Sequence, residues 1–371
     1  MSGLQVDLNA YVLPEDHVVW KCHPGKTYRF YQVVKDAEAV FLDIRGLNEL
    51  EDDPALWNDS ETLKLIAADR WSRELHRVRY DGKAKGSPAV SKIDRRNLTY
   101  LKGLLLEAKK GDLILIPAEG WRKEVLVGEF LDEPGDLIKH DARDEEATHT
   151  YIGRRVRWRA KQEKRHFSID VIKMLHTQTA FFAMPKAVRE EIYRLAYVNF
   201  MIGNVFSATF STTKEQFATS DSAVVGMWFN ALSAVRDAIE SGESIDGVSY
   251  LDLGLLRSEN PSEGELAINI NSPGEYVLRS LGPFALAVMG LFPLMQVNAQ
   301  DLVDQDINVT MHTVGAADKN CALKVEKAMK DMVETLSVTR LQVACSVGKR
   351  AATEATMHTG ARLKSRQKGT N

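Results

Sequence analysis

Short apolar stretches separated by polar turns fill the first 165 residues, and their patterns predict both strands and helices. Stretches rich in β-branched and aromatic residues predict strands at residues 18–20, 39–44, 112–117, 125–130 and 151–158. Apolar residues at helical spacing predict helices at 60–79 and 97–109. The acidic stretch 131–149 is expected to be a long hairpin loop. Strands this short and close together are typical of a small, curved antiparallel barrel with flanking helices.

From Phe167 onward the apolar residues follow helical spacing. Helices are predicted at 168–175, 185–200, 221–241 and 317–350. Strand-like stretches occur at 245–256 and 264–270, and an Asn-Ser-Pro-Gly turn is expected at 271–274. The whole pattern predicts an α+β chain with a first domain at 1–165, a mainly helical domain at 166–350, and a basic, disordered tail at 351–371.

The segment Leu281–Val297 is almost continuously apolar over 17 residues. A helix that spans a membrane needs about 20 apolar residues, with a range of roughly 17–25, so this segment is at the short limit. Pro283 and Pro293 weaken a spanning helix further. Three interpretations follow: a buried core helix, which we favour, a contact with a membrane, or a helix buried between subunits of a homo-oligomer.

Composition and charge narrow the classes of protein. The chain has 371 residues and a net charge of -3, but residues 186–348 carry 12 basic and 20 acidic side chains, and residues 349–371 carry 6 basic and 1 acidic. This uneven layout predicts different partners for different parts. The 3 cysteines are far apart in sequence, which excludes a disulfide framework and a four-cysteine zinc site. With no secretory signal visible at the start, a cytoplasmic location is expected.

The most basic stretch is residues 154–165. A strand here places Arg155, Arg157 and Arg159 on one face and Arg154, Val156 and Trp158 on the other. Arginine offers planar, paired donors that match phosphate groups, so the stretch could bind nucleic acid. The alternative is that its arginines pair with the acidic loop before it.

Several motifs of the first half occur in the order of a known family. They are Trp20 followed by Pro24-Gly25, the strand 40–44, a leucine-rich helix running into Gly111-Asp112, Gly128 in the next strand, and the Arg-x-Val-x-Trp strand 154–158. Together they resemble the N-terminal domain of Mrr-type restriction proteins, of the EVE-like and PUA-like group. The resemblance implies a small barrel that binds DNA or RNA and admits an extruded or modified base to an aromatic pocket. The long acidic loop departs from the family pattern.

The resemblance implies candidate site residues of two kinds. The rings that could stack on a base are Trp20 and Trp121, then Tyr151 and Trp158. The side chains that could contact phosphate are Arg154, Arg155, Arg157 and Arg159.

The sequence offers no recognisable catalytic centre. Walker, Gly-x-Ser-x-Gly and metal-ligand spacings are absent, and so is the Asp…Glu/Gln-x-Lys pattern of a nuclease. We therefore expect no enzyme activity, cofactor or metal. The predicted function is nucleic-acid sensing in prokaryotic antiviral or restriction-type defence, with the second half as effector or oligomeriser. The alternatives are a protein-interaction module, or a membrane-perturbing effector that acts through 281–297.

Overall fold

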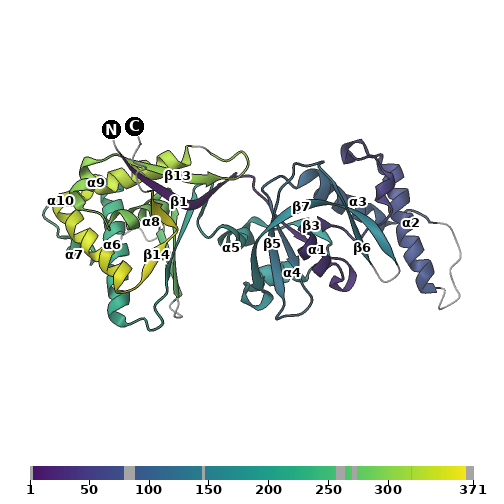
Figure 1. The fold of residues 1–371 in the computed structure, drawn as a ribbon, viewed down its shortest axis with the longest axis horizontal. Helices are drawn as coiled ribbons and strands as arrows, with labels where there is room; N and C mark the ends of the chain where they lie inside the picture. Colours follow the sequence, from purple (N-terminus) through teal and green to yellow (C-terminus); the bar gives the residue numbers. More distant parts are fainter. Residues whose placement is uncertain are drawn as a thin grey trace, which may run out of the picture. The chain divides into compact units, whose positions relative to one another are not determined.

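The computed structural model describes residues 3–78, 88–143, 147–255, 264–269, 274–318 and 320–364. The chain forms two compact units (Figure 1). Unit 1 comprises residues 1–15 and 197–371, and unit 2 comprises residues 16–196. The predicted boundary at 165/166 therefore falls inside unit 2. The physical reason is that β8 (Phe181–Ala183) pairs with β2 (Val19–Cys22), which ties residues beyond 166 to the first half of the chain.

Unit 2 is built on a curled, half-barrel sheet in the order β3-β7-β5-β4-β2-β8, with β6 beside β7. β2 pairs in parallel with β4, and the other neighbours pair antiparallel. The predicted strands are present, but the acidic loop is not entirely loop, because residues 138–143 pair with the start of β7. The remaining strands are β3 (Ala39–Phe41), β4 (Leu113–Pro117), β5 (Glu124–Phe130), β6 (Ile138–Arg143) and β7 (Thr148–Glu163).

The predicted helices of unit 2 are present with shifted ends. α3 starts at Lys92, five residues before the predicted start, because Ser91 and Asp94 form a reciprocal capping box there. Ser168 caps α4 as its sequence position predicts, since its hydroxyl accepts from the Val171 amide. The helices are α1 (Tyr31–Ala37), α2 (Asp59–Val78), α3 (Lys92–Lys102), α4 (Ile169–His176) and α5 (Lys186–Tyr197), with shorter turns at Lys26–Tyr28, Leu47–Glu49, Pro54–Leu56, Gly103–Glu107 and Lys164–His166.

Unit 1 also contains a sheet, so a mainly helical second half is not confirmed. The strand order is β11-β12-β10-β9-β1-β13, with β14 beside β10 and β15 beside β1. The N-terminal strand β1 pairs in parallel with β13 and supplies a central strand from the opposite end of the chain. The strands are β1 (Leu4–Leu13), β9 (Phe200–Ile202), β10 (Val205–Thr212), β11 (Gly264–Asn269), β12 (Gly274–Leu281), β13 (Ile307–Thr313), β14 (Met357–Thr359) and β15 (Ala361–Leu363).

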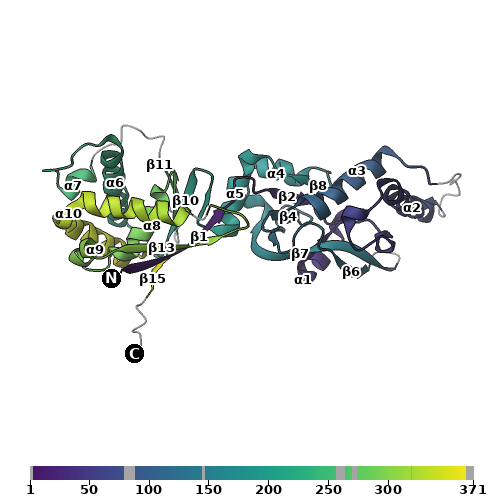
Figure 2. The same ribbon diagram turned by 90° about the horizontal axis from the view of Figure 1, so that it is seen from above.

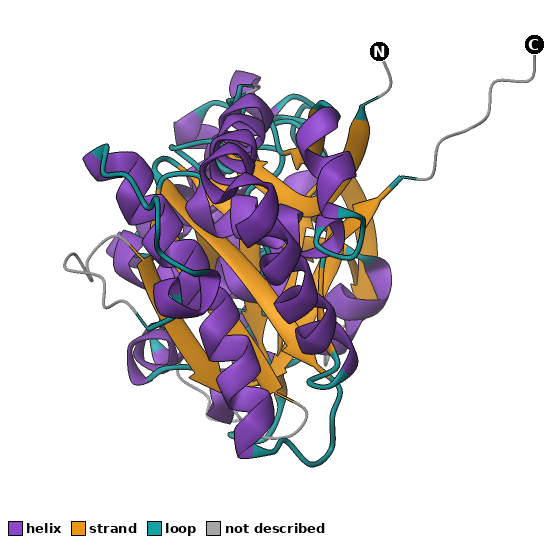
Figure 3. Ribbon diagram, turned by 90° about the vertical axis from the view of Figure 1, so that its left-hand side faces the viewer, coloured by secondary structure: helices purple, strands orange, loops and turns teal. Residues whose placement is uncertain are grey.

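The predicted disordered tail is wrong in its first part. Residues 357–363 form β14, which pairs with β10, and β15, which pairs with β1; β15 is the last strand before the end labelled C in Figure 3. Residues 365–371 lie outside the described residues. The predicted strand at 245–256 is not present as such, because part of it forms the short helix α7 (Tyr250–Leu253). Most of the predicted turn at 271–274 lies outside the described residues.

The apolar segment forms α8 (Phe284–Leu294), the central core helix of unit 1. Every side chain of α8 except Pro293 is buried, and α8 contacts β10, β1 and the long helix α10 (Figure 2). The buried-core interpretation of residues 281–297 is therefore confirmed. Within the described residues, no helix is both long and apolar enough to span a membrane. The other helices of unit 1 are α6 (Thr219–Ser241), α9 (Ala299–Asp304) and α10 (Cys321–Thr353), the last interrupted at Ser337.

Candidate functional site

Two of the four candidate aromatic rings, those of Trp20 and Tyr151, are buried, which corrects their assignment as base-stacking residues. The Trp20 ring stacks on Phe181 at 4.9 Å, is 8% exposed, and donates its Nε1–H to Asp112 at 2.9 Å. Tyr151 is fully buried, with its ring centre 5.0 Å from those of Phe30 and Phe41. A base could not stack on these two rings without opening the core. Trp158 is partly buried and donates its Nε1–H to the Lys35 carbonyl, which fixes the orientation of its ring.

Trp121 is the most exposed of the four rings. It lies between β4 and β5, in the turn that follows Ala118, and is 52% exposed. Its ring is therefore accessible for stacking from the surface of unit 2.

The arginines of β7 are arranged as the alternation predicts, but each one already has a partner. Arg154 is buried, donates to the carbonyl oxygens of Leu104, Ala108 and Asp132, and lies 4.7 Å from the centre of the Phe130 ring. It cannot reach a phosphate. Its assignment as a phosphate contact is therefore wrong.

The other three arginines of β7 form ion pairs on its more exposed face. Arg155 pairs with Asp132 at 2.6 Å, and Arg157 and Arg159 both pair with Glu129. These carboxylates belong to β5 and the residues just after it. Asp132 belongs to the acidic stretch 131–149, so the alternative interpretation holds for Arg155; residues 144–146 of that stretch lie outside the described residues. The exposed basic face is therefore largely neutralised by its own neighbouring strand.

A pocket of about 280 Å³ opens elsewhere on unit 2. Four segments that are distant in sequence form its wall: the loop after β2, the end of β3, one face of α3, and the residues before β8. Its lining combines amide, imidazole, ammonium and carboxylate groups with a tyrosine ring, and comprises His23, Gly25, Lys26, Leu42, Asp43, Ile44, Asn97, Tyr100, Gln178 and Ala180.

The loop after β2 is held in an unusual backbone conformation at the rim of this pocket. Gly25, Thr27 and Tyr28 have φ angles of 79°, 52° and 57°, a region that favours glycine. At Gly25 a side chain would not fit, because a Cβ atom there would lie 2.7 Å from the Phe30 ring. The Asp43 carboxylate accepts from the Lys26 amide at 3.3 Å and so fixes the loop to the end of β3.

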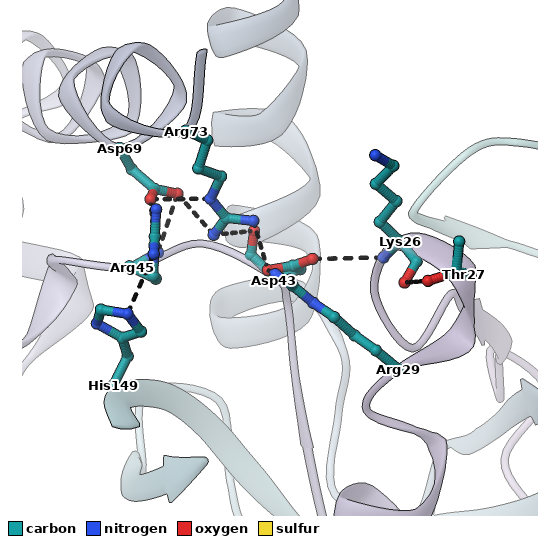
Figure 4. A network of polar contacts seen from close by, with 8 residues as sticks. All are labelled: Lys26, Thr27, Arg29, Asp43, Arg45, Asp69, Arg73 and His149. Carbon is teal, nitrogen blue, oxygen red and sulfur yellow. Dashed lines mark hydrogen bonds and ion pairs between the residues drawn. The ribbon is translucent and has the colours of Figure 1, made fainter. Parts of the chain in front are cut away.

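A network of ion pairs holds the Asp43 carboxylate in place (Figure 4). Arg29 and Arg73 donate to its carboxylate at 2.6 and 2.7 Å, and Arg73 also pairs with Asp69 on α2. Asp69 in turn pairs with Arg45, whose guanidinium contacts His149. Burial alone would raise the pKa of Asp43, but the two arginines outweigh it and hold the pKa below its ordinary value. Asp43 is therefore ionised at neutral pH, but its lowered pKa and its contacts with Arg29 and Arg73 make it a weak general base.

Two lysines are buried next to the pocket. Lys21 on β2 is 0% exposed and donates to the carbonyl oxygens of Thr177 and Thr179 at 2.9 and 2.8 Å, on either side of Gln178. Lys164 is 2% exposed, donates to the Ala118 carbonyl at 2.9 Å, and lies 5.6 Å from the centre of the Tyr28 ring. Among the residues that the structure describes, neither ammonium group pairs with a carboxylate.

The pKa values around the pocket follow from this burial of positive charge. Burial, with a contribution from Lys164, lowers the pKa of Lys21 to about 8. Burial also lowers the pKa of Lys164. Burial and the nearby Lys21 lower the pKa of His23, so its imidazole is neutral at pH 7 and offers one N–H donor. The wall thus combines neutral donors with buried cations.

The sequence analysis missed this pocket. Lys21 stands alone in the apolar strand Val18–Cys22, and a lone lysine in a buried strand is the one local signal that could have drawn attention to it. Nothing local links Asn97, Tyr100 and Gln178, because the fold alone brings them together.

The comparisons with known proteins add no family. No family model, curated protein or solved structure matches the chain. In the described part of the chain, no cluster of three or more His, Cys, Asp or Glu side chains could hold a metal ion.

Proposed function

We propose that unit 2 is a PUA-like nucleic-acid recognition module that takes one nucleotide of DNA or RNA, including an extruded or modified base, into the pocket beside His23. The observation that carries the proposal is the pocket itself, which joins polar, hydrogen-bonding side chains to a wall with buried positive charge. Its volume of about 280 Å³ lies near the lower end of small-molecule sites, which span roughly 300–1,000 Å³.

The lining has the chemistry that a base edge requires. The amides of Asn97 and Gln178 each offer both donors and acceptors, as the Watson–Crick edges of bases do. Tyr100 adds an aromatic ring and Leu42 an apolar surface. Enzymes and readers that extrude a base hold it by such edge contacts together with stacking. Trp121, exposed on the same unit, is available to a neighbouring base.

A second candidate function is a protein-interaction module. It is favoured by the ion pairs of Arg155, Arg157 and Arg159 with Asp132 and Glu129, which leave the basic face of β7 with little of the excess charge that a phosphate-binding surface uses. The two candidates differ in what they predict for the pocket and for β7.

The test is fluorescence anisotropy of the full chain with short single-stranded and duplex DNA and RNA, with plain and modified bases, at two salt concentrations. The pocket variant Asn97→Ala with Gln178→Ala should weaken binding about tenfold or more, because it removes the contacts to the base edge. The matched β7 variant Arg157→Ala should leave binding nearly unchanged. If the wild-type chain binds none of these nucleic acids at physiological salt, the proposal is wrong and the interaction module is favoured.

The role of the whole chain extends this proposal. We propose that unit 1 acts as the effector or oligomeriser of a nucleic-acid sensor, and the defence role implied by the Mrr resemblance remains a prediction. Because residues 284–294 of the apolar segment form the core helix of unit 1, insertion of this segment into a membrane would require that unit to unfold.

A further inference from the structure

The two buried lysines of unit 2 have more hydrogen-bonding capacity than the protein uses. An ammonium group has three N–H donors. Lys21 gives two of them to the carbonyls of Thr177 and Thr179, and Lys164 gives one to Ala118. Among the described residues, one donor of Lys21 and two of Lys164 are left without an acceptor. A buried charge that lacks a partner of opposite sign is costly, typically several kcal/mol, so two of them in one wall require a physical reason.

Both ammonium groups lie behind the same wall of the pocket. The carbonyls that Lys21 bonds flank Gln178, and the ring over which Lys164 lies belongs to Tyr28, which packs against His23 at 4.5 Å. His23 and Gln178 line the pocket. The mutual electrostatic effects among Lys21, Lys164 and His23 place these three groups within interaction range of one another.

Within the described part of the chain, neither lysine forms an ion pair with a carboxylate. The Cys22 thiol is the neighbour of Lys21 that could become negative, but burial raises its pKa to about 12 and keeps it protonated. The pocket carboxylate Asp43 is already shared between Arg29 and Arg73. The field at the His23–Gln178 wall is therefore positive.

We infer that this wall is a phosphate-binding subsite, in which His23 and Lys26 contact the anion and the buried charges of Lys21 and Lys164 attract it. Lys26 is exposed at the rim, and the neutral His23 ring supplies a short-range donor. A charge in a poorly solvated site acts more strongly than one at the surface. The inference rests on the proposed function in one respect, because it assigns the phosphate to the bound nucleotide.

The experiment is calorimetric titration of the full chain with inorganic phosphate, with acetate at the same ionic strength as a second anion, combined with thermal unfolding. Wild-type protein should bind phosphate, and its melting temperature should rise with phosphate concentration by mass action. Lys164→Gln keeps a donor for the Ala118 carbonyl but removes the charge, and Lys21→Met removes the other charge. Each should weaken phosphate binding about fivefold or more.

The matched control is Lys186→Gln, which removes the same charge from an exposed position at the start of α5. It should leave phosphate binding unchanged. A readout that needs no variant is the imidazole resonance of His23, which should shift in wild-type protein as phosphate is added. The inference is overturned if phosphate does not bind wild-type protein, if Lys164→Gln folds and binds it as wild type does, or if acetate binds equally well.

The outcomes separate this inference from the proposed function. Phosphate binding that depends on Lys164, in a chain that binds no nucleic acid, supports the subsite and overturns the nucleic-acid proposal. Nucleic-acid binding that depends on Asn97 and Gln178, but is unaffected by Lys164→Gln, supports the proposal and overturns the subsite.

Discussion

Unit 2 contains two groups of cations, which differ in whether they pair with carboxylates. The arginines of β7 form the densest basic stretch of the sequence, but Asp132 and Glu129 neutralise the exposed ones. Lys21 is a lone lysine in an apolar strand and Lys164 belongs to the end of the same basic stretch, but both are buried and pair with no carboxylate among the described residues. The comparison teaches that a count of charges along the sequence does not show which cations lack a counterion, because neighbouring strands can supply the carboxylates.

The largest expected effect concerns the buried arginine of β7. Arg154→Met removes the donor for three buried carbonyl groups and the contact with Phe130, so we expect unit 2 to lose roughly 3–5 kcal/mol of stability. The matched variant Arg157→Met changes a half-exposed side chain on the same strand and should cost less than about 1 kcal/mol. Hydrogen exchange of the β7 amides across a urea series measures both. Equal effects would show that the burial of Arg154 does not matter for stability.

A somewhat smaller effect is expected from the titration of Lys21. Its pKa is about 8 in the folded chain, and an unfolded lysine titrates near ~10.4. Between these values the unfolded chain binds more protons, so Lys21 makes the folded state more stable as the pH rises from 8 to 10, by roughly 2 kcal/mol. Below pH 8 the full cost of the buried charge is present. Phosphate should bind more weakly over the same rise in pH, because the ammonium loses its charge.

The measurement is the free energy of unfolding of wild type and Lys21→Met between pH 7 and 10. Since tyrosines and other lysines titrate in the same interval, the difference between the two curves is the quantity of interest. This difference should change with pH in favour of the wild type. Parallel curves would mean that Lys21 is not desolvated in the folded chain.

The elements of the fold were mostly predictable, since they depend on local periodicity. The helices around Leu63, Leu98 and Val225 and the apolar helix 284–294 follow their patterns closely. What failed depends on distant pairing. β1 joins unit 1 because it pairs with β13, some 300 residues away, and the polar strand β6 forms only because β7 lies beside it.

The candidate site was less predictable than the fold. Trp20 and Tyr151 were chosen as aromatic residues near a turn or strand end, but burial is a property of the packed unit and not of the local sequence. The pocket is formed by His23, Asp43, Asn97 and Gln178, which no motif connects. The alternation along β7 was correct, and the predicted pairing of its arginines with the acidic stretch 131–149 holds for Arg155, which pairs with Asp132. The pairing of Arg157 and Arg159 with Glu129 on β5 was not predicted.

The smallest expected effect is on nucleic-acid binding, after a carboxylate that pairs with the β7 arginines is removed. Glu129→Gln leaves Arg157 without its carboxylate while keeping the shape of the side chain. Arg157 should then attract phosphate, so non-specific binding of duplex DNA should increase several-fold at low salt. The slope of log affinity against log salt should become steeper by about one.

The matched control for this variant is Glu163→Gln, which removes a β7 carboxylate that pairs with Arg165 instead. Because Arg165 lies beyond the run of alternating arginines, it should contribute less to a continuous phosphate track. If Glu129→Gln leaves both the affinity and the salt slope unchanged, the arginines of β7 are positioned for the protein alone. Positive charge on that strand would then have no bearing on nucleic-acid binding, and the buried lysines would be the cations of unit 2 that matter for an anionic ligand.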